Sequence, residues 1–422
     1  MADASQNPLI VQSDRTLLLT VDSPLYADAR DALARFAELQ KSPEHIHTYR
    51  LTPLSLWNAA AAGHSADEVV DALARFSRYE VPQNIVAEVR DYVSRYGLLK
   101  LVRRDEKLVL TSERAEFITE IWHNRSVRPN LLAHVDEHSI EIVPVVRGHV
   151  KQALIKIGFP VEDLAGYVAG EDLAIALRAT MLDGRPFEPR QYQTEAAEIF
   201  HAGGSERGGS GVVCLPCGAG KTVVGMLAMA KLGKHTIILC TNITAVRQWI
   251  RELLDKTTLR EDDVGEYTGE MKALRPVTVT TYQILTYRKK KGDPFPHFEI
   301  FNAMNWGLII YDEVHLLPAP VFRMTAEIQA RRRLGLTATL VREDGREDDV
   351  FSLIGPKKYD VPWKVLERQG WIASASCTEL RVDLPQDLRL EYALSTLRAQ
   401  VRIAAENPAK FDVVRRLVER HR

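Results

Sequence analysis

Hydrophobic and polar positions alternate between two patterns over the second half of the chain. Short apolar or β-branched runs, typical of buried strands, are separated by segments whose apolar residues recur at helical spacing. The strand-like runs are residues 211–213, 236–240, 277–281, 308–311 and 334–336, and the helix-like segments are 196–200, 223–230 and 244–254. This alternation predicts an α/β domain with a mainly parallel sheet, helices on both faces, and ligands at the carboxyl ends of the strands.

The N-terminal part, residues 1–111, has a pattern that predicts a helical module closed by a hairpin. An extended apolar run is followed by an apolar helical stripe, by three shorter helices, and by two runs that alternate around a charged turn. These features are residues 16–21, the stripe 25–39, helices that open after Thr52, Ser65 and Val81, and runs 98–102 and 108–110. The order is that of a winged-helix module, which contacts DNA through basic side chains. The acidic residues interleaved there slightly favour a protein-docking surface instead.

Residues 112–185 predict a small separate α+β domain. A strand is expected at 140–146, interrupted by Pro144, and shorter periodic segments at 150–157, 164–168 and 173–177. Four histidines lie in this region, but their spacing fits no metal site with cysteine or carboxylate support. We expect them to be surface or packing residues.

The composition is that of a globular protein with two to four domains. The 422 residues are 45% apolar and 26% charged with a formal net charge of −1, so any nucleic-acid surface must be local. No apolar run approaches the roughly 20 residues of a spanning helix, and the first ten residues lack a signal-peptide core. We therefore expect a cytoplasmic protein without a membrane partner. Its four cysteines imply no disulfide framework, and we expect Cys214 and Cys217 to be packing residues.

A glycine-rich stretch between a strand-like run and a helix-like segment predicts a phosphate-binding loop. In Cys214-Leu-Pro-Cys-Gly-Ala-Gly-Lys-Thr222, Gly218 and Gly220 allow a tight turn that aims backbone N–H groups at phosphates. Lys221 would reach the outer phosphates of ATP, and Thr222 would offer its hydroxyl to Mg²⁺. The full pattern has a further glycine where this chain has Leu215.

Further candidate residues flank this loop in the sequence. Asp312 and Glu313 directly follow a strand, where Asp312 would hold Mg²⁺ and Glu313 would orient or deprotonate the attacking water. Upstream, Arg190 and Gln193 are expected to bind the nucleotide, and Gln193 would contact adenine, because its amide can both donate to and accept from the base. Downstream, the hydroxyls of 337–339 again follow a strand and can link the acidic site to a neighbouring surface.

With these motifs the sequence resembles superfamily 2 helicases, and among them the XPB type. The resemblance rests on Pro189-Arg-Gln-Tyr-Gln193, the phosphate loop, Asp312-Glu-Val-His315 and Leu334-Gly-Leu-Thr-Ala-Thr-Leu-Val-Arg-Glu-Asp344, with further matches at 351–357 and 407–411. It implies a RecA-like motor domain and an ATP-driven 3′-to-5′ DNA translocase of nucleotide excision repair, with a repair nuclease or repair complex as partner. It further implies strand contacts at Thr241, Asn242, Thr280 and Thr281, and a duplex-opening element at Arg342, Glu343 and Asp344.

The resemblance covers about 185–411 and is weak over 1–184, where only the general plan fits, an N-terminal module plus a small domain likened to damage-recognition domains. The expected domains are 1–111, 112–185, 186–365 and a linker with thumb-like helices at 366–422. Helicases of this class complete the ATP site with arginines of a second motor domain, for which we expect no room before residue 422. The chain alone is therefore expected to turn over ATP slowly. Alternatives are another translocase acting on RNA or of the restriction type, or an ATP-switched scaffold without enzymatic activity.

Overall fold

The computed structural model of the chain describes residues 6–41, 45–105, 107–290, 293, 295–328, 331–339, 347–373 and 378–420. This part of the chain forms two compact units, Met1–Ile372 and Ala373–Arg422. The first contains three sheets, and the second contains only helices among its described residues.

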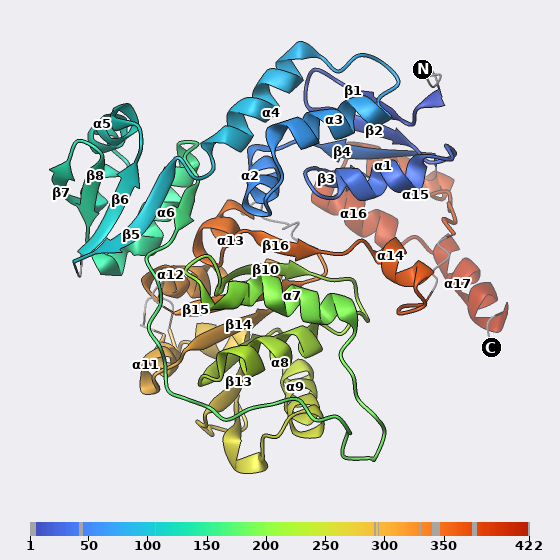
Figure 1. Cartoon of the computed structure of the whole chain (residues 1–422). Helices are drawn as coiled ribbons and strands as arrows, with labels where there is room; N and C mark the ends of the chain where they lie inside the picture. Colours follow the sequence, from blue (N-terminus) through green and yellow to red (C-terminus); the bar gives the residue numbers. More distant parts are fainter. Residues whose placement is uncertain are drawn as a thin grey trace. The chain divides into compact units, whose positions relative to one another are not determined.

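Within the described residues, seven parallel strands form the central sheet of the first unit (Figure 1). In spatial order they are β12 (Val264–Tyr267), β13 (Val277–Thr281), β11 (Thr236–Cys240), β14 (Leu308–Asp312), β15 (Arg332–Thr337), β10 (Ser210–Cys214) and β16 (Lys357–Asp360). The five central strands coincide with the expected strand-like runs, because strands covered on both faces are apolar along their whole length.

Alternate residues of each strand enter two different hydrophobic layers, since successive side chains point to opposite faces. Val213 and Ile238 belong to a layer with α7 (Gln191–His201), α8 (Lys221–Leu232) and α9 (Ile243–Lys256). Val212 and Ile237 belong to the opposite layer, with α10 (Tyr282–Thr286), α11 (Ile300–Ala303), α12 (Ala319–Glu327) and α13 (Glu347–Leu353). Helices on both faces of a parallel sheet confirm the predicted RecA-like motor domain.

The N-terminal module is built on an antiparallel sheet that the sequence pattern did not reveal. Its described strands have the order β1-β2-β4-β3 and are β1 (Leu9–Val11), β2 (Thr16–Thr20), β4 (Ile46–Arg50) and β3 (Glu38–Lys41). The helices are α1 (Tyr26–Leu33), α2 (Pro53–Ala61), α3 (Ala66–Phe76) and α4 (Gln83–Arg95). Thr52 and Ser65 form capping boxes that start α2 and α3, as their positions predicted.

The winged-helix interpretation of residues 1–111 is wrong because the expected hairpin belongs to another sheet. Strands β5 (Leu99–Arg104) and β6 (Lys107–Ser112) lie inside a second described sheet, of order β7-β8-β6-β5-β9. Its other elements are β7 (Leu131–Asp136), β8 (Ser139–Ile142), β9 (Val161–Asp163), α5 (Ala115–His123) and α6 (Arg147–Lys156). The helices of the first module bury their apolar faces on β1 and β2, so the hairpin packs with α5 and α6 instead. The expected boundary after residue 111 therefore cuts through this second sheet.

Residues 164–190 cross the motor domain without forming a helix or a regular strand, in place of the short periodic elements expected at 164–168 and 173–177. Isolated bridges join Asp172 to Lys234 and Leu177 to Thr257. Gly170 lies against this surface so closely that a Cβ there would be 2.3 Å from the Cα of Gly307. The segment is thus held along the motor domain by backbone contacts.

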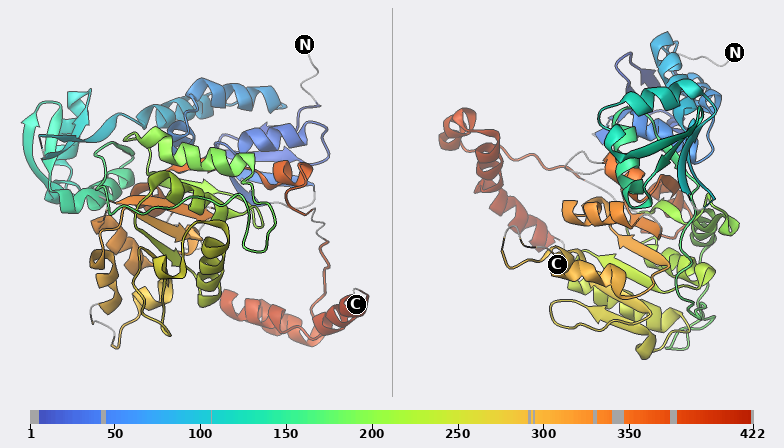
Figure 2. Two further views of the ribbon diagram at one scale, coloured as in Figure 1. Left: turned by 60° about the horizontal axis from the view of Figure 1, so that its bottom comes forward. Right: turned by 90° about the vertical axis from the view of Figure 1, so that its left-hand side faces the viewer.

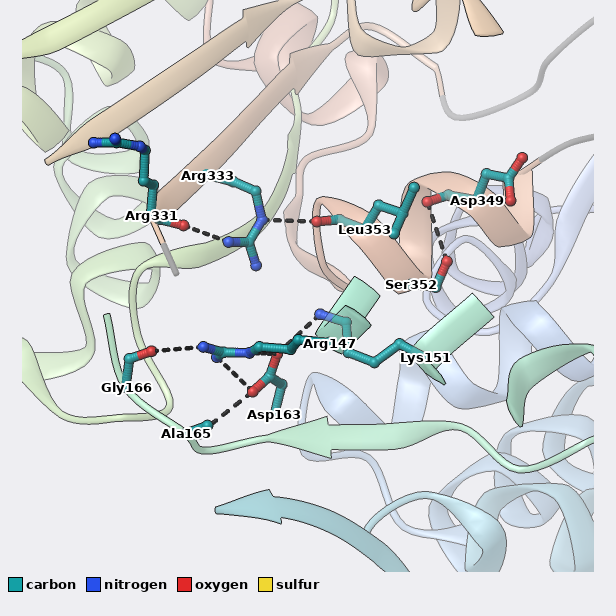
Figure 3. A network of polar contacts seen from close by, with 10 residues as sticks. All are labelled: Arg147, Lys151, Asp163, Ala165, Gly166, Arg331, Arg333, Asp349, Ser352 and Leu353. Carbon is teal, nitrogen blue, oxygen red and sulfur yellow. Dashed lines mark hydrogen bonds and ion pairs between the residues drawn. The ribbon is translucent and has the colours of Figure 1, made fainter. Parts of the chain in front are cut away.

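Buried charged side chains lie on both sides of the contact between the second sheet and the motor domain (Figure 3). Asp163 Oδ1 lies 2.6 Å from Arg147 Nη2, and its Oδ2 lies 2.9 Å from Lys151 Nζ. Burial alone would raise the pKa of Asp163, but the charges of Lys151 and Arg147 outweigh it and hold the pKa well below its usual range. On the motor side, Arg333 of β15 is fully buried and donates to the carbonyl of Leu353, 2.7 Å away.

The first module also contacts the motor domain directly. Trp57 of α2 packs in a small cluster with Ile155 and Phe351. The backbone N–H of Lys357, at the start of β16, donates to Asn58 Oδ1 at 2.7 Å. Strand β16 is therefore bound on one edge by β10 and at its start by α2. After it, α14 (Trp363–Arg368) completes the unit.

The second unit consists, in its described residues, of α15 (Gln386–Leu394), α16 (Leu397–Ala405) and α17 (Ala409–Arg420), which follow one another through short turns (Figure 2). Helices were expected within 366–422, and the described residues there contain these three. No helix in the described parts of either unit is long and apolar enough to cross a lipid bilayer.

Candidate active site

Most of the predicted site residues lie at or just after the carboxyl ends of neighbouring strands of the central sheet. The phosphate loop follows β10, Thr337 ends β15, and the acidic pair lies at the end of β14. Next come Thr241 and Asn242 after β11, and Thr281 at the end of β13. Because all these strands are parallel, their carboxyl ends meet at one edge, as ligand sites of such sheets require.

The phosphate loop has the backbone conformation that its glycines predicted. Gly218 and Gly220 have φ values of +80° and +76°, which favour glycine, and α8 begins at Lys221. Leu215 is fully buried, and its N–H donates to the carbonyl of Thr337 at 2.9 Å. This residue therefore extends β10 where the full motif has a glycine. The amides at the start of α8 form an anion site.

The two cysteines of the loop differ in environment. Cys214 is buried at the end of β10, and burial raises the pKa of its thiol. Cys217 is exposed, so the expectation that both thiols are packing residues is wrong for Cys217. The turn of the loop lifts its side chain off the sheet.

Helix α7 fixes the loop through two side chains that both donate to the carbonyl of Ala219. Gln193 Nε2 lies 2.9 Å from this oxygen and the Tyr192 hydroxyl 2.7 Å. Gln193 Oε1 accepts from the N–H of Arg190, which leaves the amide buried and committed to the loop. Its contact with adenine stays a prediction. Sequence reasoning missed Tyr192, whose place next to Gln193 in the motif was the available signal.

Arg190 lies at the start of α7, near the loop. Its guanidinium is 4.7 Å from the ring centre of Trp371 and donates to the Tyr192 hydroxyl at 2.9 Å. The planar group is thus held between an aromatic face and the side chain that fixes Ala219.

The lysine of the loop and the glutamate of the acidic pair meet across the sheet edge. Lys221 Nζ lies 2.9 Å from Glu313 Oε1. Glu313 has a φ of +50°, a left-handed conformation that is costly for a non-glycine residue and typical of functional sites. Its Oε2 is buried and accepts no hydrogen bond from the described residues, although His315 Nδ1 lies 3.5 Å away. A carboxylate oxygen without a donor suits a proton acceptor.

His315 links this acidic segment to β15. Its Nδ1 is 2.8 Å from Thr337 Oγ1, and that hydroxyl also contacts the carbonyl of Thr339. A residue of 337–339 thus contacts the acidic motif, while the link from these hydroxyls to a neighbouring surface stays a prediction.

Asp312 is held at both its carboxylate and its backbone by buried aromatic residues. Trp249 Nε1 donates to its Oδ2 at 2.9 Å, and the Tyr282 hydroxyl donates to its carbonyl oxygen at 2.9 Å. Burial raises the pKa of Asp312, while the hydrogen bond from Trp249 opposes the rise. Sequence reasoning missed both aromatic residues.

The residues present fit Mg²⁺. No group of three or more His, Cys, Asp or Glu side chains that could hold a metal occurs among the described residues. Mg²⁺ needs no such group, because it binds oxygen and usually keeps waters and substrate phosphates around one or two carboxylates. The Asp312 carboxylate and the Thr222 hydroxyl supply this chemistry at the phosphate loop.

The predicted DNA-contact residues divide into two groups. Asn242 is exposed and caps α9 by accepting from the N–H of Ala245, and Thr241 beside it is half-buried. Thr280 and Thr281 are buried, and Thr281 caps α10, so neither hydroxyl is open to a strand in this structure. Arg342, Glu343 and Asp344 lie outside the described residues.

Comparison with known proteins agrees with this geometry. Residues 9–136 match the family model of the helicase conserved C-terminal domain, and residues 186–342 match that of the type III restriction enzyme, res subunit. A DNA 3′-5′ helicase XPB of Mycobacterium tuberculosis is 53% identical over 418 residues, which cover 99% of this chain and 74% of the relative. The DNA 3′-5′ helicase XPB of Kineococcus radiotolerans is 54% identical over 99% of this chain and 73% of the relative.

More distant proteins extend the comparison. A general transcription and DNA repair factor IIH helicase/translocase subunit XPB of Enterocytozoon bieneusi is 32% identical, over 98% of this chain and 70% of the relative. Among solved structures, the UvsW helicase of bacteriophage T4 aligns with a TM-score of 0.38 and 14% identity, over 62% of this chain and 99% of that one. With over half of its residues identical to two XPB helicases along nearly its whole length, the chain belongs to the XPB family of DNA 3′-5′ helicases.

Proposed function

We propose that this chain carries the ATP-binding half of an enzyme that hydrolyses Mg²⁺-bound ATP at the edge formed by β10, β15 and β14, and that uses the hydrolysis to move 3′ to 5′ along DNA during nucleotide excision repair. The observation that carries the proposal is the 2.9 Å contact between Lys221 Nζ and Glu313 Oε1. The contact brings a phosphate-binding cation and a proton acceptor to one point, although 91 positions separate them in the sequence. Both charges are available to the γ-phosphate of ATP and to its attacking water.

Each side chain has one task in this proposal. Lys221 moves from Glu313 to the outer phosphates when ATP binds, since a phosphate is the more highly charged partner. That movement frees Glu313, which orients the attacking water and takes its proton. Thr222 and Asp312 would hold Mg²⁺, which would supply positive charge against the charge that develops on the phosphates.

Contacts with partners are a separate part of the proposal. The exposed turn at Thr241 and Asn242 is available to a DNA backbone, because hydroxyl and amide groups bind phosphates without reading bases. We further propose a protein partner from a repair complex, which the name of the Enterocytozoon relative, a subunit of factor IIH, supports. The duplex-opening role of residues 342–344 and the cytoplasmic location stay predictions.

The proposal is tested by measuring phosphate release from ATP without nucleic acid, with a forked DNA duplex, and with a forked RNA duplex of the same sequence. The Lys221→Ala variant gives the background in each case. We expect a rate above this background that rises with forked DNA and not with forked RNA. A rate that is equal with and without DNA, or equal in Lys221→Ala, would overturn the proposal. Stimulation by RNA alone would assign the chain a different substrate.

A further inference from the structure

Both turns at which DNA contact is predicted lead directly into a helix that contacts Asp312. Asn242 caps α9, and Trp249 lies two turns further along this helix. Thr281 caps α10, and Tyr282 is the first residue of that helix. The two aromatic side chains thus come from the helices that follow β11 and β13, and they converge on the residue that ends β14.

Trp249 is held rigidly where it meets Asp312. Its side chain is buried, and a Cβ placed on Gly225 of α8 would lie only 2.5 Å from its ring atom Cη2. The ring therefore packs flush against the helix that begins with Lys221, and glycine at 225 is what makes room for it. From this position the indole N–H is directed at Asp312 Oδ2, 2.9 Å away.

Tyr282 fixes the other end of the same residue. It is buried among the residues of the opposite hydrophobic layer, and its hydroxyl donates to the backbone carbonyl of Asp312 at 2.9 Å. The hydrogen bond from Trp249 restricts the rotation of the Asp312 side chain, and the one from Tyr282 fixes the backbone that carries it. The remaining carboxylate oxygen, Oδ1, is then directed by these contacts.

We propose that Trp249 and Tyr282 are positioning residues that orient Asp312 for Mg²⁺-bound nucleotide and tie this orientation to the turns at 241–242 and 281. The inference rests on the proposed function, because it needs Asp312 to face Mg²⁺. Partners of a metal ligand set its orientation, and their loss typically weakens metal affinity about 10- to 100-fold. A DNA strand that shifts the exposed turn at 241–242 moves α9, and with it the donor Trp249 to Asp312.

The first test measures the affinity for a fluorescent ADP analogue with Mg²⁺ and with EDTA, so it needs no hydrolysis. Trp249→Phe keeps a buried ring and removes the indole N–H. We expect its affinity to fall about 10-fold with Mg²⁺ and to be unchanged with EDTA. Tyr282→Phe, which removes only a hydroxyl, should weaken Mg²⁺-dependent binding in the same direction.

Two matched variants separate positioning from general packing. Trp306→Phe removes an indole N–H that donates to the carbonyl of Ile300 at 2.7 Å, and Tyr311→Phe removes a hydroxyl 3.0 Å from Thr325 Oγ1. Both residues are buried in the same motor domain but do not contact Asp312 through these groups. Their Mg²⁺-dependent affinity should equal that of the unchanged chain.

The second test asks whether DNA and nucleotide are coupled through these residues. The affinity for Mg²⁺-bound ADP analogue is measured with and without forked DNA, and Trp249→Phe should reduce the ratio towards one. The inference is overturned if Trp249→Phe loses as much affinity with EDTA as with Mg²⁺, or if its Mg²⁺ dependence is unchanged. It is also overturned if Trp306→Phe loses as much affinity as Trp249→Phe. If the unchanged chain shows no Mg²⁺-dependent binding at all, the proposed function fails as well. Failure of the inference alone is therefore distinguishable from failure of the proposed function.

Discussion

Replacing Asp163 by Asn should destabilise the first unit strongly, because it leaves two buried cations without their carboxylate. Asp163 accepts from Arg147 Nε at 3.0 Å, from Arg147 Nη2 at 2.6 Å and from Lys151 Nζ at 2.9 Å. All three side chains are at least nine-tenths buried. Two of these bonds end on Oδ2 and one on Oδ1, so the single oxygen of Asn loses one or two charge-assisted hydrogen bonds, at about 1.5–3 kcal/mol each. The resulting loss of roughly 1.5–6 kcal/mol includes the roughly 3–5 kcal/mol typical of breaking a buried ion pair, which we take as the expected range.

Thermal unfolding followed by circular dichroism measures this loss. At about 2 °C per kcal/mol, which is typical of larger domains, Tm of Asp163→Asn should fall by about 6 °C or more. The control is Asp67→Asn, the same substitution in an exposed ion pair with Arg90 at 3.2 Å. That exposed pair should contribute less than about 1 kcal/mol to the free energy of unfolding, so the Tm of Asp67→Asn should change by less than about 2 °C.

Lys151→Met distinguishes the members of the network. Burial lowers the pKa of Lys151 to about 8, which means that its charge is held at a cost even beside Asp163. Its removal should therefore destabilise the chain less than Asp163→Asn, and the double variant should be more stable than Asp163→Asn alone. Equal Tm values for Asp163→Asn and Asp67→Asn would refute the role of Asp163 as the partner of two buried cations. Strictly additive effects of Lys151→Met and Asp163→Asn in the double variant would refute it as well.

Three further predictions concern the active site and pH. Lys221→Ala should lower DNA-stimulated phosphate release at least about 100-fold, because the charge on the outer phosphates is lost; near-normal turnover would contradict this. Glu313→Gln should retain binding of a fluorescent ATP analogue while hydrolysis falls about 10²- to 10⁴-fold; loss of binding would make Glu313 structural. Lys151 should release its proton near pH 8 in the folded chain and near its ordinary pKa of 10.5 in the unfolded chain. Between these two pH values the unfolded chain binds more protons than the folded chain, so the folded chain gains stability as the pH rises. The difference in Tm between the unchanged chain and Lys151→Met should therefore increase from pH 8 to pH 10.5. A constant difference would contradict the burial of a charged Lys151.

The central strands of the motor domain could be predicted because burial on both faces leaves a continuous apolar signal. Residues 236–240 and 277–281 coincide with β11 and β13. The edge strands β12 and β16 were missed because they lack this continuous apolar signal. Strand β16 reads Lys-Lys-Tyr-Asp and is only partly buried, so its sequence carries neither an apolar run nor a clear alternation.

The first sheet was missed because a helical stripe was extended too far. Phe36 and Leu39 continue the spacing of α1, but the helix ends at Leu33, and Leu39 lies in β3 with 44% of its surface exposed. Phe36 does belong to the core, from the turn that joins the helix to the strand. Spacing alone cannot separate a buried turn residue from one more turn of helix, and β3 carries too few apolar residues to signal a strand.

The active site shows the same limit at the level of single residues. Asp312, Glu313 and Lys221 are polar residues after apolar runs, so the strand ends predicted that they would meet. Trp249 lies three residues from Val246 and four from Leu253, and all three form the buried stripe of α9. Burial already accounts for an apolar ring in this stripe, so nothing in the sequence shows that its N–H has a second task. That task follows from the order of the strands, since β11 and β14 pair although 67 residues separate Cys240 from Leu308. A hydrogen-bond donor on an aromatic ring therefore becomes visible as part of the site only when the sheet order is known.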